Sequence, residues 1–186
     1  MMFEPWQKTF HETLSRLHNH NLRPRIALVG VGHELRGDDA AGLHFVRVVS
    51  QEPNLSTLYP ELLVIEAGSA PENFSGVLRR FGPHLVVLVD AALLEVEAGV
   101  LGWVPWRDTT GLSASTHTLP LKILATYLEA ELGCQIALLG IQPANLATGE
   151  PLTLQVAHAV EAAAQTWLQI FTSFSSDLEN SMPKIV

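Results

Sequence analysis

Five short apolar runs organise most of this chain. They lie at residues 25–32, 61–68, 84–94, 99–106 and 134–142, and most are continuous rather than alternating, as in Leu85-Val-Val-Leu-Val. Runs of this length are typical of strands that are covered on both faces, as in a parallel sheet. We therefore expect five strands.

Helical patterns alternate with these strands at 38–50, 71–81 and 119–132, and a last helix is expected after Thr153. Leucines recur at 121, 124, 128 and 132, which is the spacing of one helix face. The alternation predicts an α/β protein, a three-layer α/β/α sandwich around a five-stranded, mostly parallel sheet. The link between 84–94 and 99–106 is too short for a parallel crossover, so we expect a hairpin there and a mixed sheet.

The two ends of the chain fall outside this alternation. Residues 1–24 predict a helical extension, because Phe3, Trp6, Phe10, Leu14 and Leu17 share one face. That helix would dock on the domain or on a partner. Residues 25–172 are expected to form a single α/β domain. From Ser173 the composition changes, and we predict a loosely ordered tail over 173–186.

Composition narrows the class of protein. Apolar residues make up 47% of the chain and charged residues 16%, which is typical of a globular domain. The net charge of -8, with scattered basic residues, argues against nucleic-acid binding. A single cysteine, Cys134, excludes an intrachain disulfide and fits a reducing cytoplasm. We see neither a signal peptide nor an apolar stretch of the ~20 residues that span a bilayer, and expect a cytoplasmic protein without a membrane segment.

The candidate chemistry lies in acids that follow strands. The stretch GVGHELRGDDAAG at 30–42 carries Asp38 and Asp39, and Asp90 closes the strand at 84–94. Asp38 alone is best explained as an N-cap or first-turn residue. If the strands at 25–32 and 84–94 are parallel neighbours, Asp39 and Asp90 meet at the carboxyl edge of the sheet, where α/β proteins bind ligands. His117, just before the helix at 119–132, can overhang the same edge. Two carboxylates and one imidazole form an incomplete divalent site suited to Ni, Zn, Mn or Fe(II).

Other motifs are weaker. Gly30 and Gly32 begin a dinucleotide fingerprint, but Leu35 occupies the position of the third glycine, so a nucleotide-binding α/β domain stays a minor alternative. Cys134 has no suggested acid–base partner, and we interpret it as a small buried residue. The chain contains no G-x-S-x-G elbow of a serine hydrolase.

Four blocks together resemble the hydrogenase maturation endopeptidases, cytoplasmic proteases that remove the C-terminal extension of the NiFe-hydrogenase large-subunit precursor. The blocks are GVGHELRGDDAAG at 30–42, LVVLVDAALL at 85–94, STHTLPLKILATYL at 115–128 and IALLGIQPANL at 136–146. The resemblance implies a twisted five-stranded sheet in an α/β/α sandwich, and a nickel-dependent peptidase domain at 25–172. It also implies that Asp39, Asp90 and His117 are both nickel ligands and catalytic residues. The precursor itself would supply the nickel, and other divalent ions can occupy such a site.

The resemblance is not complete. The family usually has asparagine where this chain has His33, so either the backbone-bracing role of that asparagine is not expected to carry over, or the histidine adds a fourth metal contact. Asp38, Gly32 and Gly37 are expected to support the site, Asp38 either by orienting the turn or by accepting a hydrogen bond from a metal ligand. An alternative function is a non-catalytic protein that recognises a metallated hydrogenase precursor without cutting it.

Overall fold

A computed structural model describes residues 5–20, 23–108 and 118–181. Its single sheet confirms the five predicted strands. They are β1 (Ile26–Val31), β2 (Leu62–Gly68), β3 (Leu85–Ala91), β4 (Leu101–Pro105) and β5 (Gln135–Ile141), in the order β2-β1-β3-β5-β4. All neighbouring pairs are parallel except β4 and β5. The sheet is therefore mixed and mostly parallel, as predicted.

The predicted hairpin between 84–94 and 99–106 is wrong. Strand β4 pairs antiparallel with β5, not with β3, because β3 already has parallel partners on both sides. The intervening chain crosses the end of β5 instead. There the main-chain N–H of Ala92 donates to the carbonyl of Ile141 at 2.8 Å, and that of Gly99 donates to the carbonyl of Gln142 at 2.8 Å. The short link between β3 and β4 can thus pass the end of β5 and place β4 at the edge of the sheet.

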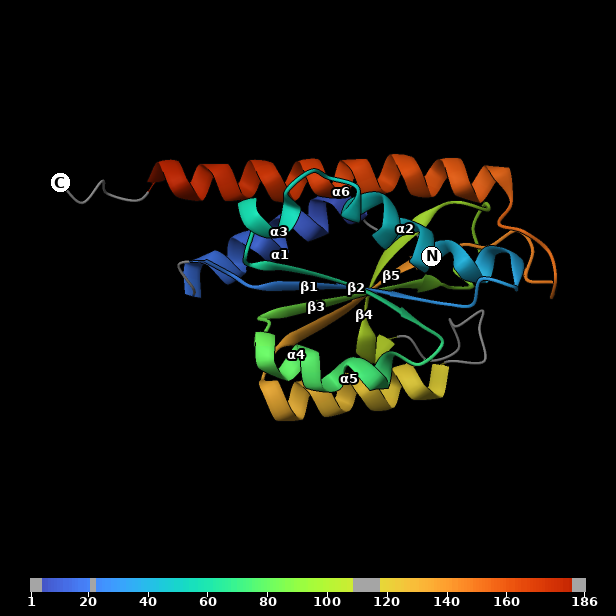
Figure 1. The fold of residues 1–186 in the computed structure, drawn as a ribbon, viewed down its shortest axis with the longest axis horizontal. Helices are drawn as coiled ribbons and strands as arrows, with labels where there is room; N and C mark the ends of the chain where they lie inside the picture. Colours follow the sequence, from blue (N-terminus) through green and yellow to red (C-terminus); the bar gives the residue numbers. More distant parts are fainter. Residues whose placement is uncertain (1–4, 21–22, 109–117, 182–186) are drawn as a thin grey trace.

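Helices cover both faces of the sheet. They are α1 (Trp6–His20), α2 (Ala41–Ser50), α3 (Leu55–Leu58), α4 (Ser75–Phe81), α5 (Thr118–Leu132) and α6 (Leu154–Ser181), with 3-10 turns η1 (Gly37–Ala40), η2 (Pro71–Phe74) and η3 (Trp106–Asp108). Figure 1 shows α1, α2, α3 and α6 on one side of the sheet and α4 and α5 on the other. The described residues therefore form the predicted three-layer α/β/α sandwich.

Helix α1 docks on the domain itself. Trp6, Phe10, Leu14 and Leu17 are buried, and the helix packs against α6 and β4. Phe10 stacks on Trp167 of α6 with ring centroids 5.0 Å apart. Aromatic pairs of this kind add to the stabilisation that burial of their apolar area supplies. The face predicted from the sequence for residues 6–17 is thus part of one of the two hydrophobic cores.

The predicted loose tail from Ser173 is also wrong over most of its length. Helix α6 continues to Ser181. Phe171, Ser175 and Leu178 are buried, and Phe174 packs edge-on against His18 of α1 with ring centroids 6.1 Å apart. Because apolar residues continue at helical spacing among the serines, the helix keeps a buried face to its end. Within the described ranges no helix, α6 included, is both long and apolar enough to cross a membrane.

Candidate functional site

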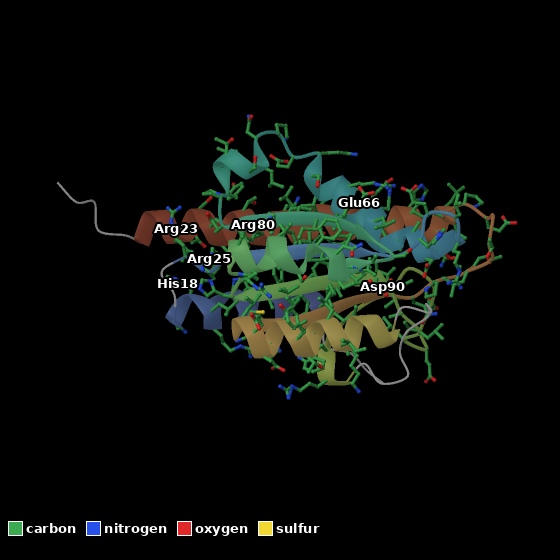
Figure 2. The ribbon with its side chains drawn as sticks, turned by 60° about the horizontal axis from the view of Figure 1, so that its bottom comes forward. His18, Arg23, Arg25, Glu66, Arg80 and Asp90 are labelled. Carbon is green, nitrogen blue, oxygen red and sulfur yellow. The ribbon has the colours of Figure 1, made fainter. Side chains whose placement is uncertain are left out.

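The carboxyl edge of the sheet, where β1, β3 and β5 end, holds both candidate acids. Strands β1 and β3 are parallel neighbours, with Gly30 of β1 opposite Val89 of β3. Asp90 is therefore close to the level at which β1 ends, and η1, which carries Asp39, packs against β3. Figure 2 shows Asp90 at this end of the molecule, away from Arg25 and His18. The expected neighbourhood of the two strands is confirmed.

Glycines hold the turn after β1 against the sheet. Gly32 has φ +138°, and a Cβ there would lie 1.8 Å from the carbonyl oxygen of Asp39. In the first turn of α2, a Cβ on Gly42 would lie 2.1 Å from the carbonyl oxygen of Val89 and 2.4 Å from that of Val31. Only glycine permits these approaches. The turn with the two aspartates therefore packs closely against the ends of β1 and β3.

The two acids are removed from water. Asp39 is 0% exposed and Asp90 1% exposed. The guanidinium of Arg36 lies 4.0 Å from Asp39 Oδ2, and Asp90 Oδ1 accepts the main-chain N–H of Ala91 at 2.9 Å. Burying two carboxylates at one edge costs free energy unless positive charge or donors accompany them. Carboxylate oxygens of this kind suit a divalent cation, so Asp39 and Asp90 fit the predicted metal centre.

The third predicted ligand, His117, lies outside the described residues. Among the residues that are described, no three His, Cys, Asp or Glu side chains gather at one point. The convergence of Asp39, Asp90 and His117 therefore stays a prediction, and with it their role in catalysis.

Asp38 differs from its neighbour Asp39. It occupies the first turn of η1, as expected, but it is not an N-cap, because neither η1 nor α2 has a side-chain cap. Its carboxylate instead accepts hydrogen bonds from the loop between β5 and α6. The reason is burial: at 0% exposure the charge needs hydrogen-bond donors, and this loop supplies them.

His33 braces the turn. Its Nδ1 accepts the main-chain N–H of Leu35 at 3.1 Å, while its own main-chain N–H donates to the carbonyl of Asp39 at 3.2 Å. The first bond braces the turn, a role that the sequence did not predict for a histidine at this position. A fourth metal contact through the other ring nitrogen stays a prediction.

A groove of about 410 Å³ runs beside this turn and the end of β2, and its lining includes Gly32, His33, Leu35, Leu43, Glu66 and Ser69. Glu34 and Glu66 on its rim are both hydrogen-bonded to Arg47 of α2. The hydrogen bond from Arg47 holds the pKa of Glu66 below its usual range. These two acids are thus paired with a fixed cation, the guanidinium of Arg47.

Cys134 lies away from the edge of the sheet that holds the two acids. It immediately precedes β5, at the opposite edge of the sheet, and it is buried. Burial raises the pKa of its thiol to about 11, so the thiolate that a nucleophile requires is not formed at neutral pH. The prediction of a small buried residue is confirmed.

Two polar residues at this edge were not predicted from the sequence. Gln142, in the quoted block 136–146, accepts the main-chain N–H of Leu94 at 2.7 Å with its Oε1. Thr153 donates to Asp38 with both its main-chain N–H and its hydroxyl. A polar residue directly after an apolar strand was the available signal for Gln142, whereas Thr153 resembles an ordinary residue before a helix.

The fold and the acids define a class of protein, an α/β sandwich whose functional groups lie at the carboxyl edge of a mostly parallel sheet. The family model described as HycI, hydrogenase maturation protease, matches residues 46–170, a range that includes Asp90 and begins shortly after Asp39. The chain belongs to the hydrogenase maturation protease family.

Individual relatives agree in sequence and in fold. The hydrogenase 3 maturation protease of Escherichia coli is 30% identical over 139 residues, which are 74% of this chain and 85% of that protein. The crystal structure of the NiFe hydrogenase maturation protease HycI from Thermococcus kodakarensis superimposes with a TM-score of 0.73 at 30% identity, over 86% of this chain and 99% of that one. The solution structure of the endopeptidase HycI from Escherichia coli gives 0.65 at 30% identity, over 76% and 87%.

Proposed function

We propose that this protein is a nickel-dependent endopeptidase that removes the C-terminal extension of a NiFe-hydrogenase large-subunit precursor after nickel has been inserted. The observation that carries the proposal is the burial of Asp39 and Asp90 at one edge of the sheet. Family membership supports the peptidase reaction, and the buried acid pair supports the dependence on a cation.

Nickel is part of the substrate in this proposal. It arrives bound to the precursor, and Asp39, Asp90 and His117 would complete its ligand set. A bound divalent ion of this kind can polarise a carbonyl or lower the pKa of a water. The protein's own contribution is to hold one peptide bond beside these groups, and positioning alone can lower a barrier by about 7 kcal/mol or more.

The groove beside the turn is the proposed place for the precursor chain. It adjoins Gly32 and His33, whose main chains contact that of Asp39. Leu35 on its rim is 65% exposed, and Leu43 also lines it. An extended segment that leaves the metal in this direction would therefore meet apolar contacts and main-chain polar groups together, which is usual for recognition of a polypeptide.

The reaction is proposed to occur in the cytoplasm, where the single thiol of Cys134 stays reduced. The partner is the large-subunit precursor, and neither nucleic acid nor membrane takes part.

The test is incubation of the purified protein with nickel-loaded and nickel-free precursor, followed by mass spectrometry of the intact products. We expect only the loaded precursor to lose the mass of its C-terminal extension, and zinc or manganese in place of nickel tests the selectivity of the ion. A loaded precursor that keeps its full mass would contradict the proposal. If it also co-elutes with this protein in gel filtration, the non-catalytic binding protein becomes the better description.

A further inference from the structure

The loop between β5 and α6, residues 142–153, donates several hydrogen bonds to the carboxylate of Asp38. Asp38 Oδ2 accepts the main-chain N–H groups of Ala144 at 2.7 Å and Asn145 at 2.9 Å, and the hydroxyl of Thr153 at 3.1 Å. Asp38 Oδ1 accepts the main-chain N–H of Thr153 at 2.7 Å. Both oxygens are thus engaged by donors of one loop, which lies more than a hundred residues away in the sequence.

Main-chain bonds join the same two segments. The N–H of Asp38 donates to the carbonyl of Asn145 at 2.8 Å, and the N–H of Gly37 donates to that of Glu150 at 2.9 Å. In the other direction, the N–H of Gly149 donates to the carbonyl of Leu35 at 2.8 Å. The turn after β1 and the loop 142–153 are therefore one hydrogen-bonded unit, with the Asp38 carboxylate at its centre.

The turn needs this support. Helix η1 has four residues and no side-chain cap, and short 3-10 helices have poor intrinsic hydrogen-bond geometry. Gly37 at its start has φ +57°, and a Cβ there would lie 2.4 Å from the carbonyl oxygen of Asn145. Its shape is consequently set by contacts with the loop rather than by local propensity.

The loop is also tied to the chain that leaves Asp90. Gln142, at the start of the loop, accepts the N–H of Leu94 with Oε1 at 2.7 Å and donates from Nε2 to the carbonyl of Pro143 at 3.2 Å. Because β5 is the parallel neighbour of β3, the loop begins beside the end of the strand that carries Asp90. The loop 142–153 is thus hydrogen-bonded both to the turn that carries Asp39 and to the segment that follows Asp90.

We propose that Asp38 is a positioning residue of this peptidase, which sets the place of the Asp39 carboxylate relative to Asp90 by fixing the turn to the loop 142–153. The proposal rests on the proposed function. Asp38 itself does not hold the metal, because its two oxygens already receive four hydrogen bonds from the loop. The two neighbouring acids therefore have different roles. Asp38 fixes the shape of the turn, and Asp39 binds the substrate's metal.

The substitution Asp38→Asn tests this role. Whichever way the amide is turned, its NH2 group meets at least one main-chain N–H of the loop, so a bond is replaced by a repulsive contact. We expect a folded protein in which amide hydrogen exchange at Ala144, Asn145 and Thr153 is at least tenfold faster. On nickel-loaded precursor, kcat should fall at least tenfold while KM changes less than about threefold, since Asp38 itself does not line the groove.

Substitutions at two threonines provide a graded version of this test and a control. Thr153→Val removes only the hydroxyl bond to Asp38 and should give a smaller change in the same direction, which Thr153→Ser should reverse. Thr166→Val makes the same change on α6, where the hydroxyl donates to the carbonyl of Ala162, and should alter neither exchange in the loop nor kcat.

The outcomes separate the two proposals. If the wild type cuts the loaded precursor and Asp38→Asn cuts it with the same kcat despite faster exchange, the positioning role is wrong and the proposed function stands. If the wild type itself does not cut, the proposed function is wrong. Should Asp38→Asn fail to fold, the same comparison is made with Thr153→Val, and wild-type kcat in that variant with faster loop exchange overturns the positioning role.

Discussion

The carbonyl oxygen of Asp39 lies so close to Gly32 that a Cβ at position 32 would come to 1.8 Å from it. This contact closes the turn after β1, together with the bond from His33 N–H to the same carbonyl at 3.2 Å. A glycine at one end of the turn therefore determines where the acid at the other end can lie.

Replacement of Gly32 by alanine should consequently destabilise the protein and disturb the site. The backbone at φ +138° is unfavourable for alanine, and the clash with Asp39 adds to that strain. We expect a loss of about 3 kcal/mol in the free energy of unfolding, measured by urea denaturation. Gly133→Ala is the matched control, because Gly133 has φ +62° but open space around it, and should cost about 1 kcal/mol. Equal losses in the two variants would show that the contact with Asp39 is unimportant.

The end of helix α6 should contribute to stability. Leu178 is buried, and we expect Leu178→Ala to lower the free energy of unfolding by about 2 kcal/mol. Asp177→Ala, on the exposed face of the same turn, should change it by less than about 0.5 kcal/mol. Thermal unfolding followed by circular dichroism measures both. A neutral Leu178→Ala would restore the original expectation of a loose tail from Ser173.

His84 should make stability depend on pH at the edge opposite the acids. Its Nδ1 accepts the main-chain N–H of Arg25 at 2.7 Å, and burial, followed by the charge of Arg25, lowers the pKa of its imidazole below 6.5. Figure 2 shows Arg25 with His18, Arg23 and Arg80 at that end of the molecule. The unfolded chain therefore takes up the proton first as the pH falls. The stabilisation from neutral His84 is present above about pH 6.5 and is lost as the pH falls below it.

Substitution of His84 by asparagine tests this dependence, since the amide oxygen can accept the same N–H and does not titrate. We expect the melting temperature of the wild type, relative to that of His84→Asn, to fall between pH 7.5 and pH 5. His158→Asn, at an exposed position of α6, controls for the loss of one histidine. A constant difference between wild type and His84→Asn over this range would contradict the assignment.

Much of the fold could be predicted from the sequence, because local pattern determines it. Continuous apolar runs and helical stripes located all five strands and the apolar face of α1. The partner of β4 could not be predicted in this way, since strand pairing depends on which edge of the sheet is free and not on the length of the link. The extension of α6 was missed because serines hide the spacing of Phe171, Phe174 and Leu178.

The site was predictable only in part, for a similar reason. An acid that ends an apolar strand is delivered to the carboxyl edge by topology alone, so Asp90 could be located from its place in the sequence. For Asp38 the sequence predicts an N-cap or first-turn position, which is a local role, whereas its hydrogen-bond donors at 144, 145 and 153 lie more than a hundred residues further along the chain. Long-range hydrogen bonds to main-chain groups leave no pattern in side-chain identity.

The acids at 39 and 90 are not expected to stabilise the fold in the absence of metal. Replacing a buried carboxylate by the isosteric amide removes a desolvated charge, and at position 39 it also removes the ion pair with Arg36. These effects oppose each other, so we expect Asp39→Asn and Asp90→Asn to fold and to have a free energy of unfolding within about 1 kcal/mol of the wild type without metal. Chemical denaturation in the presence of a chelator measures this. A loss of several kcal/mol would mean that the two acids are structural.

The most direct test of the whole account is the initial rate at which nickel-loaded precursor is cut by the wild type and by Asp39→Asn, Asp90→Asn and His117→Ala, with Asp177→Asn as a control on the exposed face of α6. The account predicts that the wild type and the control cut at equal rates, and that each of the other three variants is at least about a thousandfold slower while remaining folded. Cutting at the wild-type rate by folded Asp39→Asn, Asp90→Asn and His117→Ala would contradict it.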